Sequence, residues 1–413
     1  MNKMKVLLVG NHTCGNRGDA AILRGLVSEL RAQDPSIDID IISRFPVSSS
    51  YLLGEKVYSD TLDAFHRNHQ GIKGRVFKIA LPWLLRMTCA GLPLFILPNH
   101  FVKHIKNLQK YDAIIQVGGS FFVDLYGETQ FEHALSALSA GKPIYLLGHS
   151  VGPFERKRFK SLAKMVFNNV SLLSLRERVS LAHLKGLSCE NSVISQGADT
   201  AWLVPNLTIP LKNHWYKKLQ EKKTIAITVR NLAPFDRRLG ISQDSYEHAM
   251  SMMIEALIQK GYRVALFSTC TGIDSYNRDD RMVALNIAEK IDNSTECIVI
   301  MDELNDIELG QCLSECILTI GTRLHSAIIS MNFNTPAIAL NYEHKSKGIM
   351  AQLGVPDCSS DLTELVDGSL TSKAFDLLKK IEVCEFDISS PVENERQRAK
   401  TMISQFLQNF ERS

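Results

Sequence analysis

Short apolar runs alternate with amphipathic helical patterns along most of this 413-residue chain. Met4–Val9 is a buried-strand candidate, a polar glycine-bearing loop follows it, a helical pattern begins near Ile22, and Ile37–Ser43 is a second strand candidate. A strand, a crossover helix and another strand in close succession form the repeating unit of a parallel sheet. The sequence therefore predicts an α/β fold.

The alternation occurs in two series, with a break in periodicity near Pro205–His214. We therefore predict two Rossmann-like domains, residues 1–205 and 206–390, that face each other across a cleft, followed by a charged amphipathic helix at 391–413. Ligands of open α/β sheets bind at the carboxyl ends of the strands, so the cleft is the predicted site. The strand candidates are residues 112–117, 143–147, 171–175, 224–229, 262–268, 297–301, 317–320 and 337–340.

Composition narrows the class of protein. With 45% hydrophobic and 22% charged residues, the chain is neither disordered nor a collagen or a coiled coil. A net charge of +3 gives no reason to expect a nucleic-acid partner. The nine cysteines include no CxxC pair, and the N-terminus has only a short apolar run, so we predict a cytoplasmic protein with reduced thiols and neither metal nor cofactor.

One segment of the first domain departs from this balance. Residues 64–111 hold eight Lys or Arg and no acidic residue, together with the apolar stretch Ile79–Leu97. Arg86 and Pro82 interrupt that stretch, which argues against a transmembrane helix. Two readings remain open. The segment lies on an anionic membrane surface, or it is a helical pair packed on the first domain with a solvated basic face.

Polar and glycine residues follow the first-domain strands. In the loop after the first strand, Asn16, Arg17 and Asp19 are candidates to bind an acceptor, although Asn16 or Asp19 would also serve as a helix cap. Gly118 and Gly119 would allow a ligand to approach the backbone closely, or they form a plain turn.

Three further residues or pairs lie at strand ends of the first domain. Asp124 follows the two glycines, and His149 lies between Gly148 and Gly152 at the end of a strand. A functional role is predicted for His149, with a structural one as the alternative. Arg176–Glu177 is more typical of a structural pair.

The second domain has the most informative motif, Gly321–Ala327, at a transition from strand to helix. There a helix N-terminus, Arg323 and His325 would form an anion site with a titratable group. Arg230 ends the first strand of this domain and would supply a second guanidinium. His325 would otherwise only cap the helix. Asn341–Lys345 would add charged groups to the same rim.

These residues resemble the polysaccharide pyruvyl transferase family over nearly the whole chain. The colanic acid biosynthesis branch (the WcaK type) looks closest, and Asp274–Asn277 and Asn341–Lys345 also look like that branch. The resemblance is carried by the segments Gly10–Asp19, Gln116–Phe122, Gly148–Pro153 and Gly321–Ser326.

The resemblance implies a GT-B-like fold and a reaction. The pyruvyl group of phosphoenolpyruvate, a co-substrate, is moved onto two hydroxyls of one sugar, giving a cyclic ketal and phosphate. The acceptor would be a glycan of an exopolysaccharide, lipid-linked and presented at the inner membrane. Arg323, Leu324 and His325 match the family's segment for phosphoenolpyruvate binding and catalysis, and Arg230 and His149 are further candidates.

Within that reaction, we predict His325 as the general acid. The general base is left open among Asp19, Asp124 and His149. Two other functions compete with this one. The first is a GT-B glycosyltransferase that uses a nucleotide sugar. The second is a non-catalytic, membrane-associated component of the polysaccharide assembly machinery.

Overall fold

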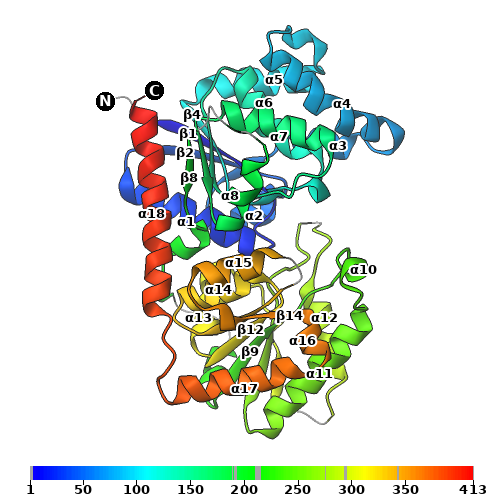
Figure 1. Cartoon of the computed structure of the whole chain (residues 1–413), viewed down its shortest axis with the longest axis vertical. Coiled ribbons are helices and arrows are strands. Elements are labelled where there is room, and N and C mark those ends of the chain that lie inside the picture. The colour runs from blue at the N-terminus through cyan, green and yellow to red at the C-terminus, as the bar shows by residue number, and fades with distance from the viewer. Residues whose placement is uncertain are drawn as a thin grey trace. The chain divides into compact units, whose positions relative to one another are not determined.

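The computed structural model describes residues 3–187, 189, 193–209, 215–274, 276–292, 295–341 and 344–412. Its contacts divide the chain into two compact units (Figure 1). The N-terminal unit consists of Met1–Thr13, Ile22–Leu203 and Arg396–Ser413. The C-terminal unit consists of Cys14–Ala21 and Val204–Glu395. Each is an α/β unit built on a parallel sheet, as the alternation of apolar runs and helical patterns predicts.

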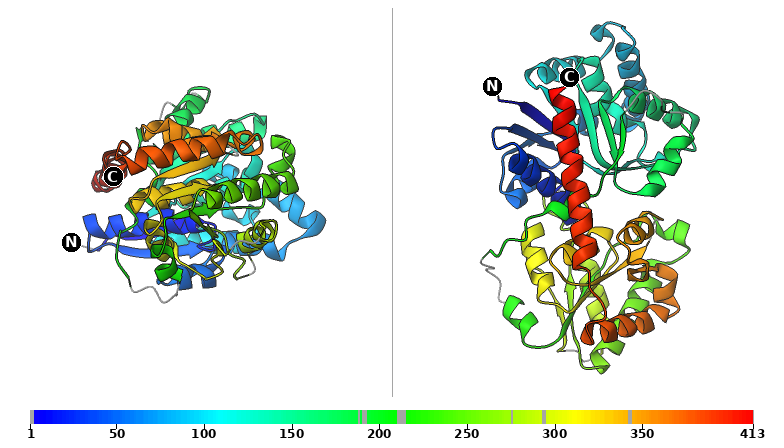
Figure 2. Two further views of the ribbon diagram at one scale, coloured as in Figure 1. Left: turned by 90° about the horizontal axis from the view of Figure 1, so that it is seen from below. Right: turned by 60° about the vertical axis from the view of Figure 1, so that its left-hand side comes forward.

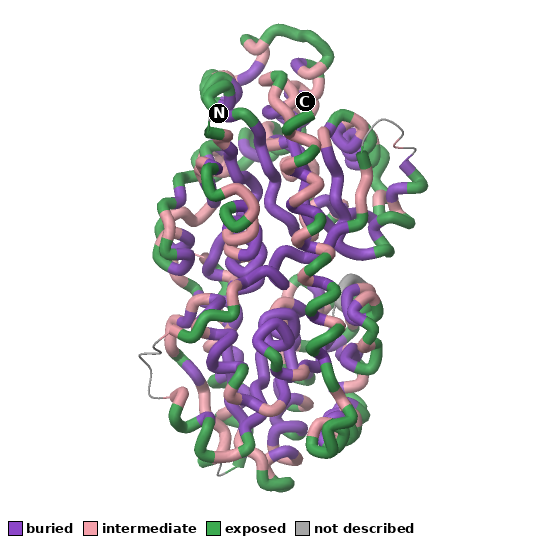
Figure 3. Tube along the Cα trace, turned by 90° about the vertical axis from the view of Figure 1, so that its left-hand side faces the viewer, coloured by how far each residue is buried: buried purple, intermediate pink, exposed green. Residues whose placement is uncertain are grey.

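The sheet of the N-terminal unit has the strand order β3-β2-β1-β4-β6-β7-β8, with β5 paired to β6. The pairing of β1 with β4 aligns Val6 with Ala113 and Leu8 with Ile115. The central strands are buried on both faces (Figure 3), which explains why they are continuous apolar runs. The strands are β1 (Lys5–Asn11), β2 (Asp38–Ser43), β3 (Val57–Ser59), β4 (Ala113–Gln116), β5 (Gly119–Phe122), β6 (Ile144–Val151), β7 (Leu172–Leu175) and β8 (Ile194–Gln196).

Helices flank this sheet, and some of them are formed by the basic segment, residues 64–111. Leu81 and Leu85 of α4, and Phe101 and Ile105 of α5, are buried in the same hydrophobic cluster as the sheet. The segment 64–111 therefore packs on the N-terminal unit, as the second of the two readings predicts. Among the described residues, no helix combines the length and apolarity needed to cross a bilayer. The helices are α1 (Arg17–Gln33), α2 (Pro46–Leu53), α3 (Thr61–Asn68), α4 (Gly71–Cys89), α5 (Asn99–Asn107), α6 (Glu132–Ser139), α7 (Lys157–Asn169) and α8 (Arg178–Lys185).

The sheet of the C-terminal unit has the order β11-β10-β9-β12-β13-β14. Its strands are β9 (Thr224–Thr228), β10 (Arg263–Phe267), β11 (Cys297–Val299), β12 (Leu318–Gly321), β13 (Ala337–Asn341) and β14 (Ser359–Asp361). Its helices are α9 (Trp215–Gln220), α10 (Asp236–Leu239), α11 (Gln243–Gln259), α12 (Asp280–Glu289), α13 (Asp306–Ser314), α14 (Leu324–Asn332), α15 (His344–Gln352), α16 (Leu362–Val366) and α17 (Ser369–Glu382).

The division of the chain differs from the expected ranges in two ways. The segment Cys14–Ala21, which includes the first turn of α1, belongs to the C-terminal unit, because the Arg17 amide donates to the Thr269 carbonyl at 2.8 Å and the Thr271 amide donates to the Gly15 carbonyl at 3.0 Å. The last helix, α18 (Ser389–Glu411), runs back to the N-terminal unit (Figure 2). There Phe406 meets Tyr145 edge-on, with ring centroids 4.7 Å apart.

Candidate active site

Two arginines follow neighbouring strands of the C-terminal sheet. β9 and β12 pair in parallel, with Thr228 opposite Gly321, so their carboxyl ends lie at the same edge. Arg230 comes two residues after β9, and Arg323 two residues after β12. The structure therefore brings together the edge positions from which the sequence predicted an anion site.

Arg323 is fixed by a carboxylate that the sequence did not reveal. Its Nε and Nη2 donate to the two oxygens of Asp280 at 2.8 and 2.9 Å. Asp280 is 1% exposed and also accepts a hydrogen bond from the Cys270 amide at 3.1 Å. A two-point arginine–carboxylate contact sets the plane of the guanidinium as well as its position. The Arg323 side chain is 13% exposed, so the group is held in place yet still reaches the surface of the unit.

Hydroxyl groups hold the turn that carries Arg323 and His325. The Ser326 hydroxyl donates to the Arg323 carbonyl at 2.6 Å and receives a bond from Thr228 Oγ1 at 2.7 Å. Thr322 Oγ1 lies 2.8 Å from the hydroxyl of the buried Tyr246. These contacts fix the start of α14, where Leu324 is buried and His325 is partly exposed in the first turn. An anion at this edge would meet the amide end of the helix dipole.

The segment after β1, from Cys14 to the first turn of α1, packs against His325. A Cβ built on Gly18, in that first turn, would lie 2.6 Å from both Cγ and Nδ1 of His325, closer than real Cβ contacts allow. Glycine at this position therefore lets the helix backbone lie against this imidazole. Asn16 accepts the Gly18 amide at 3.0 Å and forms an isolated bridge with Cys270. The loop thus belongs to the same site as His325, although it was expected in the first domain.

Arg323 and Asp19 carry opposite charges, and both influence the pKa of two weakly acidic side chains, Cys270 and Tyr276. Burial raises the pKa of the Cys270 thiol to about 12, and Arg323 and Asp19 act on it in opposite directions. Burial also raises the pKa of the Tyr276 hydroxyl, again with opposing effects from Asp19 and Arg323. Asp19 therefore lies in the electrostatic neighbourhood of Arg323, and both Cys270 and Tyr276 are neutral at pH 7.

Arg17 corrects one expectation. It was predicted to bind an acceptor, but it is 1% exposed and its guanidinium is directed into the C-terminal unit. It donates to the Cys14 carbonyl at 2.8 Å and to Thr271 Oγ1 at 2.9 Å, and it pairs with Glu303. These bonds give Arg17 the role of anchoring the loop, because a guanidinium used in this way has no donors left directed at solvent.

Arg230 is also buried, at 6% exposure, and lies two residues beyond the end of β9. Its Nε donates to the Asn231 carbonyl at 3.0 Å, and its guanidinium lies 5.1 Å from the centroid of the Phe235 ring. A cation held on an aromatic face keeps its charge while part of its hydration is removed.

His149 is a core residue of the N-terminal unit in this structure. It is fully buried, its Nε2 lies 3.1 Å from the Gln116 carbonyl, and its ring packs 5.1 Å from that of Phe122. Burial lowers the pKa of His149 to about 4, so the imidazole is neutral at pH 7. This corresponds to the structural alternative, because the ring offers no surface to phosphoenolpyruvate.

The glycines and Asp124 of the N-terminal unit also have internal partners. Gly118 is required because a Cβ there would meet the Gly148 carbonyl oxygen at 2.5 Å, and Gly119 opens strand β5, which the sequence did not predict. Asp124 accepts the amides of Glu155 and Arg156 at 2.7 and 3.0 Å, just before α7. These contacts give Gly118 and the Oδ2 atom of Asp124 structural roles, while Oδ1 of Asp124 is buried without a hydrogen-bond partner among the described residues. Acceptor binding by the three residues stays a prediction.

Over residues 16–344 the sequence matches the family described as polysaccharide pyruvyl transferase. The chain belongs to the polysaccharide pyruvyl transferase family. The amylovoran biosynthesis protein AmsJ of Erwinia amylovora is 50% identical to it over 400 residues, or 95% of this chain and 96% of the relative. The family predicted from the strand-end motifs is confirmed, and membership supports a transferase that acts on a glycan.

Solved structures of low sequence identity share the fold of this chain. The UDP-GlcNAc 2-epimerase of Neisseria meningitidis, solved with UDP-GlcNAc, has a TM-score of 0.59 at 12% identity and covers 98% of this chain and 100% of its own. The UDP-GlcNAc 2-epimerase of Methanocaldococcus jannaschii has a TM-score of 0.57 at 14% identity and covers 98% and 99%. These likenesses confirm the predicted class of two Rossmann-like α/β domains.

Some residues predicted to belong to the site lie outside the described part of the chain. These are Ser275, Tyr342 and Glu343, together with the side chains of His344 and Lys345. Sequence reasoning missed the supporting residues Asp280, Tyr246 and Thr228. Asp280 opens a helix after a strand, as Asp and Glu often do, and that position was its only signal.

Proposed function

We propose that this pyruvyl transferase moves the pyruvyl group of phosphoenolpyruvate onto two hydroxyls of one sugar in an exopolysaccharide repeat unit, forming a cyclic ketal and releasing phosphate. The observation that carries the proposal is the fixed turn at the start of α14, where Arg323 and His325 lie together at a helix N-terminus. The AmsJ relative supports an exopolysaccharide as the product, and we propose a colanic-acid-like one.

The site suits a dense anion. Phosphoenolpyruvate carries both a phosphate and a carboxylate, so its binding needs more than one cation as well as amide donors. Arg323 and Arg230 follow adjacent strands and would divide these two groups between them. The contact with Asp280 orients Arg323 before the substrate arrives, which reduces the entropy lost on binding. Phosphoenolpyruvate is already activated, so the proposed reaction needs no cofactor.

His325 is the proposed general acid. It delivers a proton to the methylene carbon of phosphoenolpyruvate, which becomes the methyl group, while one sugar hydroxyl attacks C2 and loses its proton to a base. Phosphate then leaves, and the second hydroxyl adds to C2 and releases its proton, which closes the ketal. Of the three candidate bases, Asp19 is the one near Arg323. Asp124 accepts two backbone amides at its Oδ2 and has its Oδ1 buried, and His149 is fully buried.

The acceptor is proposed to be a lipid-linked glycan, with the 4- and 6-hydroxyls of a galactose-type sugar as the site of transfer. Large apolar side chains of the basic segment remain exposed, including Ile72 (82%) and Phe95 (83%). A surface that combines such groups with Lys and Arg is attracted to anionic lipid. We therefore propose that the reaction takes place in the cytoplasm, at the inner surface of the membrane.

A coupled assay tests the reaction. Phosphate release from phosphoenolpyruvate should require an exopolysaccharide repeat unit, and NMR of the product should show a ketal methyl group. Transfer from a nucleotide sugar, with no dependence on phosphoenolpyruvate, would instead identify a glycosyltransferase and overturn the proposal.

Vesicle sedimentation tests the membrane contact. The protein should sediment with vesicles that contain phosphatidylglycerol and not with pure phosphatidylcholine. Ile72→Asp with Phe95→Asp should reduce sedimentation and leave the turnover of a soluble acceptor unchanged. Equal sedimentation of the variant would exclude this surface.

A further inference from the structure

A cavity of about 710 Å³ lies in the N-terminal unit, apart from the residues described above. Gly10 of β1 and Gln116, the last residue of β4, line it, as do Arg44 and Asp60, which follow β2 and β3. The cavity is therefore at the carboxyl edge of this sheet, where ligands of α/β proteins bind. Helices α3 and α4 of the basic segment form its other side. Its volume is within the range of pockets for small ligands.

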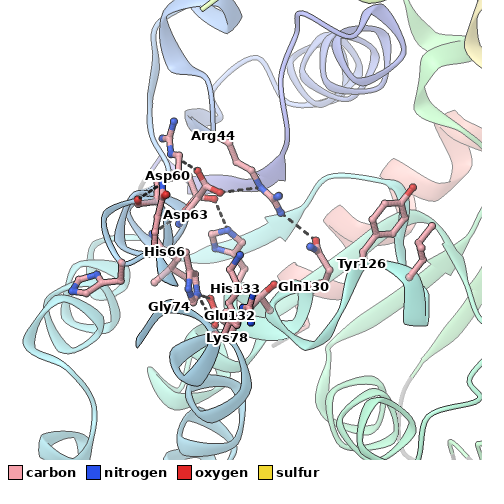
Figure 4. Close-up of a pocket in the computed structure, with 18 of the residues that line it drawn as sticks. Arg44, Asp60, Asp63, His66, Gly74, Lys78, Tyr126, Gln130, Glu132 and His133 are labelled. Atoms are coloured by element: carbon pink, nitrogen blue, oxygen red, sulfur yellow. Dashed lines mark hydrogen bonds and ion pairs between the residues drawn. The ribbon is translucent and has the colours of Figure 1, made fainter. Parts of the chain in front are cut away.

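Two histidine–carboxylate pairs give the cavity a firm wall (Figure 4). His133 Nε2 lies 2.9 Å from Asp60 Oδ2, and His66 Nε2 lies 2.9 and 3.0 Å from the two oxygens of Glu132. Asp60 also accepts the Leu62 amide at 3.0 Å, and the nearby histidine holds its pKa below the usual range. Both carboxylates are buried and paired, so they hold the wall in place rather than binding a ligand cation.

Arg44 is likewise engaged within the cavity. Figure 4 shows it between Asp63 and Gln130. Its Nε is 3.8 Å from Asp63, and its Nη2 donates to Gln130 Oε1 at 3.2 Å. The interior is therefore polar with its charges matched, which suits the hydroxyl groups of a sugar better than a bare ion.

Gln116 has an unmet hydrogen-bonding group in this wall. The residue is 2% exposed, and its Oε1 is buried without a hydrogen-bond partner. A buried amide oxygen that lacks a partner loses about 1–3 kcal/mol of solvation. Because Gln116 lines the cavity, a hydroxyl of a bound ligand would supply the missing donor.

The rim of the cavity on α4 is positively charged. Arg75 and Lys78 line it, both are exposed, and among the described residues no carboxylate lies within 4 Å of either. At 3.6 residues per turn, the exposed Ile72 and Ile79 lie about a quarter turn away round the same helix. The cationic rim thus adjoins the surface that we propose for membrane contact.

We infer that this cavity binds an anionic sugar segment of the acceptor glycan, with Gln116 accepting from a sugar hydroxyl and Arg75 and Lys78 holding an acidic group at the rim. The inference rests on the proposed function, since it specifies which acceptor the enzyme takes. The acidic group is either the carboxylate of a uronic acid or the diphosphate that joins a glycan to its lipid.

Titration calorimetry without phosphoenolpyruvate tests the inference. The probes are lactose, a glucuronosyl-galactose disaccharide and galactose 1-diphosphate. At least one acidic probe should bind more tightly than lactose, by roughly tenfold for each charge contact. The preferred probe shows whether the rim accepts a carboxylate or a diphosphate. Equal affinity for all three would overturn the inference.

Variants locate the binding. Arg75→Gln with Lys78→Gln should remove the preference for the acidic probe, whereas Lys103→Gln with Lys106→Gln, which changes the charge of the same segment outside the cavity, should keep it. Gln116→Met should weaken all three probes, with the thermal unfolding midpoint recorded to confirm folding. An unchanged preference in the first variant would overturn the assignment to the rim.

Turnover separates this inference from the proposed function. If the wild-type enzyme makes the ketal but Arg75→Gln with Lys78→Gln leaves KM for an acidic acceptor unchanged, the cavity is not the acceptor site although the function holds. If acidic probes bind in the cavity but no phosphoenolpyruvate is consumed, the proposed function fails while the binding site remains.

Discussion

Each unit has an arginine at the carboxyl edge of its sheet, paired with a buried aspartate. In the N-terminal unit, Arg176 Nη1 donates to Asp199 at 2.6 Å, and in the C-terminal unit Arg323 Nε donates to Asp280 at 2.8 Å. Both aspartates are almost fully buried. The arginines differ in exposure, because the Arg176 side chain is 3% exposed and that of Arg323 is 13% exposed.

The partners of the two arginines explain that difference. Arg176 also donates to the hydroxyls of Ser150 and Ser120, at 2.7 and 2.6 Å, so its guanidinium is enclosed by its own unit. The histidines repeat the contrast, since His149 is fully buried while His325 is partly exposed. A charged residue at a strand end thus supports the fold where it is enclosed and is available to a ligand where it reaches the surface.

The largest effect should come from exchanging the two histidines for glutamine. His325→Gln removes the proposed proton donor, and general acid catalysis contributes roughly 10²–10⁴-fold to a rate. We expect kcat for ketal formation to fall by that factor, measured as phosphate release in a single turnover. His149→Gln should keep kcat within a few-fold, because its imidazole contacts only the interior. A full wild-type rate in His325→Gln, or a comparable loss of kcat in His149→Gln, would reverse the roles given to the two histidines.

Arg176→Met should have the next largest effect, on stability. It leaves Asp199 and Glu177 buried without their cation, and breaking a buried ion pair in this way costs about 3–5 kcal/mol. Arg323→Lys keeps a charge beside Asp280 and should cost much less stability, but it should raise KM for phosphoenolpyruvate because the two-point contact is lost. Urea unfolding and steady-state kinetics measure the two effects. Equal loss of stability in both variants would show that the two arginine–aspartate pairs contribute equally to the stability of the fold.

The sequence predicted the positions of these residues better than their surroundings. β9 and β12 are buried on both faces, so their apolar runs and the strand ends that carry Arg230 and Arg323 are visible without a structure. Asp280 is 43 residues from Arg323 and belongs to a different strand–helix unit, so no local pattern links them. The burial of His149 was equally hidden, because it depends on β5 and β7, which pair on either side of it.

The cavity of the N-terminal unit shows the same limit. The sequence shows that residues 64–111 are strongly basic, but it does not show which of these charges line a pocket. The structure places Arg75 and Lys78 at the rim of a pocket and Ile72 on an exposed surface of the same helix, so a single stretch of sequence carries two features. Helical spacing separates these faces only once the start of α4 and its buried side are known.

Acid should weaken the fold through buried histidines. Burial lowers the pKa of His149 to about 4, below its ordinary value near 6.5. At a pH between these two values, the imidazole is protonated in the unfolded chain and neutral in the folded chain. Stability therefore falls as the pH drops from 6.5 towards 4, by about 3 kcal/mol for this residue. His12 and His104 are shifted in the same direction.

Urea midpoints measured at several pH values check this sign. The wild-type midpoint should decrease from pH 7 to pH 4.5, and His149→Gln should show a shallower decrease. A wild-type midpoint that does not change between pH 7 and 4.5 would contradict the buried, neutral state of His149.

The smallest stability effect is expected at Gly18. Its comparison with Gly118 again distinguishes the carboxyl edges of the two sheets. A methyl group there would lie 2.8 Å from Cβ of His325 and 2.6 Å from its Cγ and Nδ1, so the whole side chain must shift, and Gly18→Ala should cost about 1–3 kcal/mol. A displaced acid, in addition, can lower a rate by as much as 10²-fold. Gly118→Ala places its methyl group against the carbonyls of Gly148 and Leu147, which belong to the backbone of the sheet, so it should lower the melting temperature more. We expect Gly18→Ala to lose kcat with a smaller loss of stability and Gly118→Ala to lose stability first. The reverse order would mean that the loop after β1 does not position His325.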